Sequence, residues 1–216
     1  MASTGLTFPG TGADNTAVGS VSWGNQDDTE LITYHKLDDG NDVTTDANVG
    51  PGATTYYLFA SNFGFAVPAG ATIDGIEVKV ETKMNAAGQA AGMDCSAAGA
   101  KIFIAGAAAG TANTTDIWLS DDPTYTATTL GSSTDKWGLT PSVAQVNASD
   151  FGVGITATRE SVNGKCRVDY IQMNIYYTEA ASGPANLKTT NTITKANTKT
   201  ANTIAIASVK TWNTIV

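Results

Sequence analysis

Apolar and polar residues alternate along three segments of the chain, which is the pattern of strands that bury one face. In residues 72–82, isoleucine and valine at every second position face one side, while glutamate and lysine face the other. Residues 151–158 and 167–178 repeat this alternation. In 167–178 the apolar face is predicted to be the one that contains Ile171, with Val168 on the opposite, more polar face.

Weaker strands are predicted where β-branched and aromatic residues lie between turn-rich runs of Gly, Pro, Asn and Asp. They cover residues 20–24, 30–37, 55–66, 100–105 and 115–119. A short helix is predicted within 141–149, after a proline. Residues 86–100 and 105–114 are rich in Ala and Gly and nearly uncharged, so we expect flexible loops there. About eight strands with long loops predict an all-β fold, a two-sheet antiparallel sandwich with a jelly-roll order, or alternatively an immunoglobulin-like order.

The composition agrees with an all-β chain, and the distribution of charge divides it. Charged residues make up 15% of the sequence, against about 25% in an average globular domain, and exposed helix faces normally need many of them. Residues 1–180 hold 8 basic and 20 acidic residues, a net charge of −12, whereas 181–216 hold four lysines and no acid, a net charge of +4. The change falls at the small-residue stretch 180–184, which is typical of a linker. We therefore predict an N-terminal arm, a sandwich body, a linker and a β-repeat tail, at 1–19, 20–180, 181–186 and 187–216.

The tail contains three copies of the pattern Lys-Thr-x-Asn-Thr-Ile, which begin at Lys188, Lys199 and Lys210, 11 residues apart. An odd period would turn every side chain to the other face of a continuous strand, so each copy is expected to contain a turn or bulge at its asparagine. Short strands of this kind bury little alone, and we expect them to stack or to pair with other chains. The alternative is a disordered tail. The predicted assembly interface consists of Leu187, Lys188, Asn191, Ile193, Lys199, Asn202, Ile204, Ile206, Val209, Lys210, Trp212, Asn213 and Ile215.

Candidate catalytic and metal-binding residues are few. His35, the one histidine, lies in a predicted strand without a nucleophile motif around it, so no enzyme is expected. Asp38, Asp39 and Asp42 supply the hard oxygen ligands that Ca²⁺ prefers, but their spacing is not that of an EF-hand and a turn explains them without metal. No other cofactor is expected.

Tryptophans offer a second kind of site. Trp118 and Trp137 lie in a body rich in Thr, Asn and Asp, where an exposed ring would stack on a glycan whose hydroxyls bind the polar side chains. The alternative is that both rings pack in the core. Trp212 lies in a tail with few apolar residues, and we expect it to insert into another subunit or into a pocket on the body.

Net charge and hydropathy argue against nucleic-acid binding and membrane insertion, whereas the cysteine content leaves the disulfide state open. A net charge of −8 repels phosphate backbones, so nucleic acid is not an expected partner. No run approaches the roughly 20 apolar residues that span a bilayer, so we expect no membrane insertion. Cys95 and Cys166 form no multi-cysteine framework; they either pair in a disulfide or remain thiols.

Four stretches of the body, 57–78, 135–139, 150–153 and 168–178, together resemble a β-sandwich domain of tailed-bacteriophage virion proteins. The resemblance covers about residues 20–179. The tail resembles the K-T-W-N-G-type terminal repeats of phage structural and fibre-like proteins, and its best match is Ala-Ser-Val-Lys-Thr-Trp-Asn at 207–213. It departs from them in having threonine where glycine usually follows asparagine, which disfavours a tight type I′ turn.

The resemblance implies a non-enzymatic structural component of a phage virion, such as a fibre, decoration or tail-associated protein. Its expected partners are copies of itself, for example in a trimer, and other virion proteins. It would be assembled in the host cytoplasm and be extracellular in the mature particle. Two alternatives are a carbohydrate-binding or adhesive module that recognises a host-surface glycan, and a self-assembling extracellular filament subunit.

Overall fold

The computed structural model describes residues 1–24, 45–85, 93–94, 99–118, 125–159 and 164–181. The chain divides into two units, Met1–Ala180, here called the sandwich unit, and Ala181–Val216. All the described strands belong to the sandwich unit. The predicted strand 30–37 and the tail repeats lie outside the described residues.

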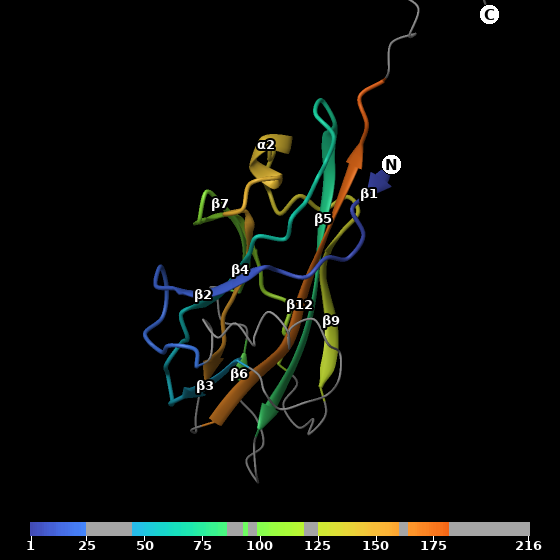
Figure 1. The fold of residues 1–216 in the computed structure, drawn as a ribbon. Helices are drawn as coiled ribbons and strands as arrows, with labels where there is room; N and C mark the ends of the chain where they lie inside the picture. Colours follow the sequence, from blue (N-terminus) through green and yellow to red (C-terminus); the bar gives the residue numbers. More distant parts are fainter. Residues whose placement is uncertain (25–44, 86–92, 95–98, 119–124, 160–163, 182–216) are drawn as a thin grey trace, which may run out of the picture. The chain divides into compact units, whose positions relative to one another are not determined.

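The first sheet is built on two long antiparallel strands, β5 (Thr72–Asn85) and β12 (Gly164–Thr178), which run side by side in Figure 1. Strand β9 (Thr126–Ser132) pairs with the free side of β5. The other side of β12 pairs with β3 (Thr45–Val49) along one part of its length and with β1 (Ala2–Ser3) along another. Two separate short strands therefore cover the edge of the longest one.

The second sheet has the order β2-β4-β10-β7-β8, and all its pairs are antiparallel. Its strands are β2 (Thr11–Asn15), β4 (Tyr57–Ser61), β7 (Ala100–Ile104), β8 (Ala107–Asn113) and β10 (Gly152–Ile155). A small separate sheet pairs β6 (Met93–Asp94) with β11 (Thr158–Arg159). The two large sheets pack against each other, which confirms the predicted all-β, two-sheet antiparallel sandwich.

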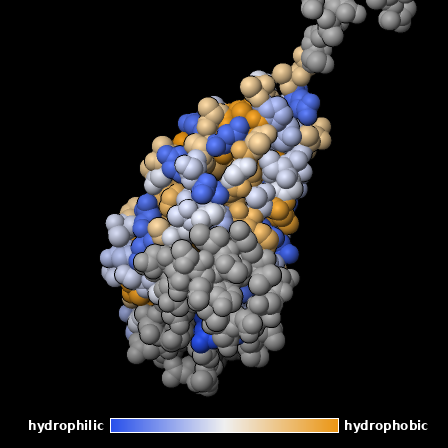
Figure 2. Space-filling model, viewed as in Figure 1, coloured by the Kyte–Doolittle hydropathy of each residue, from blue (hydrophilic) through white to orange (hydrophobic). Residues whose placement is uncertain are grey.

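The core lies between the two large sheets. Ile76, Val78 and Val80 of β5 are fully buried, as the alternation predicted, while Glu77 and Lys79 between them are partly exposed. The facing sheet contributes Leu58, Ala60, Ile102, Val153 and Ile155. Figure 2 shows hydrophobic residues dispersed among hydrophilic ones on the described part of one face, as expected when the large apolar side chains are inside.

A β-bulge on β12 changes which of its residues face the core. The register with β5 shifts between Val168 and Tyr170, so that Asp169 is the extra residue. The buried residues in the core cluster from this strand are Cys166, Val168, Ile171, Met173 and Ile175. The outer-face assignment of Val168 was therefore wrong, because one inserted residue reverses the alternation along a strand.

The N-terminal residues belong to the sandwich and do not form the separate arm expected at 1–19. Strand β1 pairs in one sheet and β2 in the other. Between them, the backbone N–H of Thr4 donates to the oxygen of Ile175 (3.0 Å) and that of Thr7 to the oxygen of Met173 (2.9 Å). These contacts are made by the backbone, so small and polar side chains suffice and no apolar alternation marks them.

The loop predicted at 105–114 is a strand, β8, joined to β7 by a two-residue turn. Ala105 (φ 53°) and Gly106 (φ 70°) both have positive φ, as in the type I′ turns of tight β-hairpins. Most of β8 is exposed, and its side chains are small and uncharged. Such an edge strand pairs through its backbone, so its sequence carries no burial pattern.

Several other predicted elements differ in extent. The predicted strands at 55–66, 100–105 and 151–158 contain β4, β7 and β10, in that order. After β4 ends, buried and exposed residues continue to alternate, with Phe63, Phe65 and Val67 buried. Residues 20–24 and 115–118 form no strand. The predicted helix is a single turn, α2 (Val143–Val146), which begins with a capping box between Ser142 and Gln145.

Replacement of Ala105 by asparagine is expected to stabilise the protein by about 0.5–1 kcal/mol, because asparagine tolerates positive φ better than alanine. The measurement is the urea midpoint of unfolding, followed by tryptophan fluorescence. Ala108→Asn, on the exposed part of β8, is the matched control and should give no gain. A lower midpoint for Ala105→Asn than for the unchanged chain would contradict the strain argument.

Candidate functional site

Most of the candidate residues that the sequence offered lie outside the described residues. These are Asp38, Asp39, Asp42, Cys95 and every residue of the tail interface, together with His35, for which no catalytic role was expected. Cys166 lies buried on β12. The calcium site, the disulfide and the assembly interface therefore remain predictions. Within the described part of the chain, no group of three or more His, Cys, Asp and Glu side chains could hold a metal ion.

Trp118 is a core residue. Its side chain is 0% exposed, and its indole N–H donates to the oxygen of Thr156 at 3.1 Å. Its ring stacks on that of Trp23, with centroids 6.3 Å apart and planes inclined by 26°. The backbone N–H of Trp118 is held by the Oδ1 atom of Asp116 at 2.8 Å. A ring enclosed in this way has no face open to a glycan, so Trp118 packs in the core, as the alternative interpretation expected.

Trp137 is also mostly enclosed, at 3% exposure, but it lines a pocket. It lies in the turn that follows β9, and its indole N–H donates to the oxygen of Ile76 on β5 at 3.0 Å. Its backbone has φ 56°, a left-handed conformation that is rare for a bulky residue. The Oδ1 atom of Asp135 accepts its backbone N–H at 2.7 Å and thereby helps to hold this turn.

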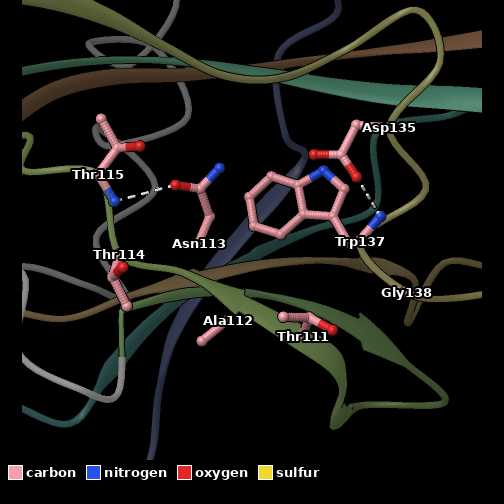
Figure 3. Close-up of a pocket in the computed structure, with 8 residues that line it drawn as sticks. All are labelled: Thr111, Ala112, Asn113, Thr114, Thr115, Asp135, Trp137 and Gly138. Carbon is pink, nitrogen blue, oxygen red and sulfur yellow. Dashed lines mark hydrogen bonds between the residues drawn. The ribbon is translucent and has the colours of Figure 1, made fainter.

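The pocket, here called the Trp137 pocket, has a volume of about 360 Å³ and is formed by two segments that are distant in the sequence. One segment is the end of β8 and the residues that follow it; the other is the turn after β9. Figure 3 shows the indole of Trp137 in view between the side chains of Asn113 and Asp135. The lining residues are Thr111, Ala112, Asn113, Thr114, Thr115, Asp135, Trp137 and Gly138.

Backbone hydrogen bonds fix the two segments of the pocket to each other and to the first sheet. The N–H of Thr111 donates to the oxygen of Trp137 at 2.8 Å, and the N–H of Ile76 donates to the oxygen of Asp135 at 2.8 Å. A Cβ atom at Gly110 would lie 2.3 Å from the oxygen of Trp137, so only glycine allows this approach. The pocket wall is therefore part of the sandwich structure.

The described residues that line the pocket are mostly polar, and one of them, Asp135, is acidic. Asp135 is exposed, and its second oxygen, Oδ2, makes no hydrogen bond within the described part of the chain. Asn113 uses Oδ1 to accept the backbone N–H of Thr115 at 3.0 Å, which leaves its Nδ2 atom without a bond to any described residue. Three threonine hydroxyls complete the set of donors and acceptors. This arrangement can bind hydroxyl groups.

The sequence pointed to one part of this pocket only. Trp137 was singled out for its ring. Residues 111–114 lay in a stretch expected to be a loop and Thr115 began a predicted strand, and no spacing connected them to Asp135. No family model, curated protein or solved structure matches the chain. Among the described residues, no helix is long and apolar enough to cross a membrane.

Proposed function

We propose that this chain is a non-enzymatic structural component of a phage virion, a fibre, decoration or tail-associated protein, that assembles through its C-terminal repeats. The observation that carries the proposal is the division of the chain at Ala180/Ala181. Every described strand of the two packed sheets lies before it, and all three Lys-Thr-x-Asn-Thr-Ile copies lie after it. A sandwich followed by a repetitive segment is an organisation in which one unit can be displayed while the other attaches.

The composition of the tail supports a role in association. Each six-residue copy carries one isoleucine, and the third also carries Trp212, among residues that are mostly Thr, Asn and Lys. This is too little apolar surface for the copies to form a core of their own. Pairing with other chains would satisfy the backbone of such short segments. The charges of −12 in 1–180 and +4 in 181–216 attract between molecules, and salt should weaken this contribution.

The assignment to a virion is supported by the resemblance of residues 20–179 to a sandwich domain of tailed-phage virion proteins and of the repeats to terminal repeats of fibre-like proteins. Display on a particle makes a direct test available. Antibodies raised against the purified protein should label intact phage particles that encode this chain, in a regular pattern by immunogold electron microscopy. Particles without label would contradict the proposal.

Substitution of the repeat isoleucines Ile193, Ile204 and Ile215 by aspartate is expected to dissociate the assembled protein. The full-length chain should sediment as a discrete oligomer, a small whole-number multiple of the chain mass, and the triple variant as a monomer. Both effects of the change favour dissociation, because it removes apolar contacts and lowers the net charge of the tail from +4 to +1. The measurement is sedimentation velocity at low and high salt.

The matched control replaces Thr189, Thr200 and Thr211 by serine, which keeps the charge and the apolar positions of the repeats. This control should sediment like the unchanged chain. Near-ultraviolet circular dichroism from the buried tryptophans checks that the sandwich of each variant is intact. Equal sedimentation of the isoleucine variant and the unchanged chain would contradict assembly through the tail, and open-ended growth with concentration would favour a filament subunit.

A further inference from the structure

We propose that the Trp137 pocket binds a neutral, polyhydroxylated ligand of the size of one monosaccharide. This activity goes beyond a structural role and does not depend on it. The volume of about 360 Å³ is at the lower end of the range of small-molecule sites, roughly 300–1,000 Å³, which fits a single sugar ring.

The hydrogen-bonding groups of the pocket match hydroxyl groups. The Oδ2 atom of Asp135 accepts from ligand hydroxyls, and the Nδ2 atom of Asn113 donates to their oxygens. The hydroxyls of Thr111, Thr114 and Thr115, which line the same pocket, do either. A ligand with several adjacent hydroxyls can use these groups at the same time, whereas a ligand with one polar group leaves most of them to water.

The charge of the pocket selects against anions. Among the described residues that line the pocket, Asp135 is the one ionisable side chain, and none of them is a lysine or an arginine. Residues 1–180 carry −12 in total, which adds to the repulsion. A hydrogen bond to a carboxylate is stronger than one between neutral groups, so the same charge favours a ligand that donates hydroxyl hydrogens.

Apolar contact comes from Trp137, the methyl of Ala112 and the threonine methyls. With Trp137 at 3% exposure, only a small part of its surface is open to the ligand. This corrects the expectation of ring stacking and places most of the recognition on the polar groups. Affinity is then expected to be weak, on the order of millimolar, as for other small ligands with few buried atoms.

The pocket is organised before the ligand binds. Trp137 is held at both ends, by its indole N–H on Ile76 and its backbone N–H on Asp135. Asn113 is oriented by the N–H of Thr115. Because these side chains are already restrained, binding loses little additional side-chain entropy.

Saturation-transfer NMR on the full-length protein tests the proposal. The probes are the methyl glycosides of D-glucose, D-galactose, D-mannose and N-acetyl-D-glucosamine, with glucuronate and glucose 6-phosphate as anionic counterparts. At least one neutral sugar should give a saturable signal, and the anions should give none at equal concentration. Absence of a saturable signal from every neutral sugar up to about 50 mM, or equal binding of the anions, would overturn the proposal.

Variants locate the binding to this pocket. Asp135→Asn keeps an oxygen for the backbone N–H of Trp137 but removes the charge, and it should weaken binding by about tenfold. Thr114→Trp, at an exposed lining position, should abolish the signal by filling the pocket. Thr129→Val, at an exposed position on β9 outside the lining, is the control and should bind as the unchanged chain does. Unaltered binding in both pocket variants would place the sugar elsewhere and refute the site.

Discussion

Replacement of Gly152 by alanine is expected to destabilise the sandwich by about 3 kcal/mol or more. Gly152 lies on β10, the middle strand of the second sheet, opposite Ser61 of β4 on one side and Phe103 of β7 on the other. A Cβ atom there would lie 2.0 Å from the backbone oxygen of Ala60. That oxygen belongs to a strand paired with β10, so relief of the clash requires the two strands to separate.

Urea unfolding followed by tryptophan fluorescence measures this loss directly. The control is Gly64→Ala, since a Cβ atom at Gly64 would meet nothing within 4 Å, although its φ is +69°. This control should lose about 1–2 kcal/mol, the cost of a left-handed alanine alone. Similar losses for the two variants would show that the strands adapt and that close approach does not explain glycine at position 152.

Gly154, two residues further along β10, leaves space for aromatic side chains on the outer face of the same sheet. A Cβ atom there would lie 2.5 Å from the ring of Phe103 and 3.0 Å from the Cβ atom of Tyr57. With glycine, the Phe103 ring stacks on Phe59 (4.6 Å between centroids) and meets Tyr57 edge-on (5.2 Å). Burial in this cluster raises the pKa of the Tyr57 phenol. The glycines of β10 thus make room for aromatic side chains from the strands on both sides.

Truncation of Trp118 to alanine is expected to cost about 3–5 kcal/mol, the usual loss for a fully buried aromatic residue. Two effects add to the cavity. The stacking partner Trp23 loses the contact at 6.3 Å, and the oxygen of Thr156 loses the indole N–H that now reaches it at 3.1 Å. A buried carbonyl without its donor adds about 1–3 kcal/mol unless water enters the cavity.

Trp118→Phe separates these effects, because it keeps most of the ring but removes the indole N–H. We expect it to retain a substantial part of the stability lost in Trp118→Ala. The free energy of unfolding of both variants, from urea titration monitored by far-ultraviolet circular dichroism, provides the comparison. A loss below about 1 kcal/mol in Trp118→Ala would show that this ring is not an essential part of the core.

The pattern of apolar residues predicted β4, β5, β7, β10 and β12, each of which buries at least two apolar side chains in the core, but not β3 and β9, which each contribute one of the described core residues. It located β5 and the apolar end of β12, because a side chain at every second position must avoid water there. It missed β2 and β8, whose short sequences, Thr-Gly-Ala-Asp-Asn and Ala-Ala-Ala-Gly-Thr-Ala-Asn, hold no large apolar side chain. These strands are held by backbone pairing with β4 and β7, and backbone hydrogen bonds leave little trace in side-chain order.

The candidate site likewise depends on backbone contacts that the order of side chains does not reveal. The sequence indicated Trp137 as one residue of the site because of its ring. The backbone hydrogen bonds of Trp137 with Thr111 and with the Asp135 side chain, however, depend on a turn in which Trp137 has positive φ. No rule of spacing brings residues 111–115 to 135–138. The tail repeats and the aspartate-rich turn at 38–42 remain predictions.

By itself the sequence determined the all-β class, the alternating core strands and the change of charge at 180–184, because these follow from local composition and from a period of two. The tertiary structure decided the order of the strands, the reversal of alternation at Asp169 and the pocket between β8 and the Trp137 turn. Each of these depends on which backbones pair across long stretches of chain. Pairing of that kind is settled by packing of the whole domain rather than by the residues of any one segment.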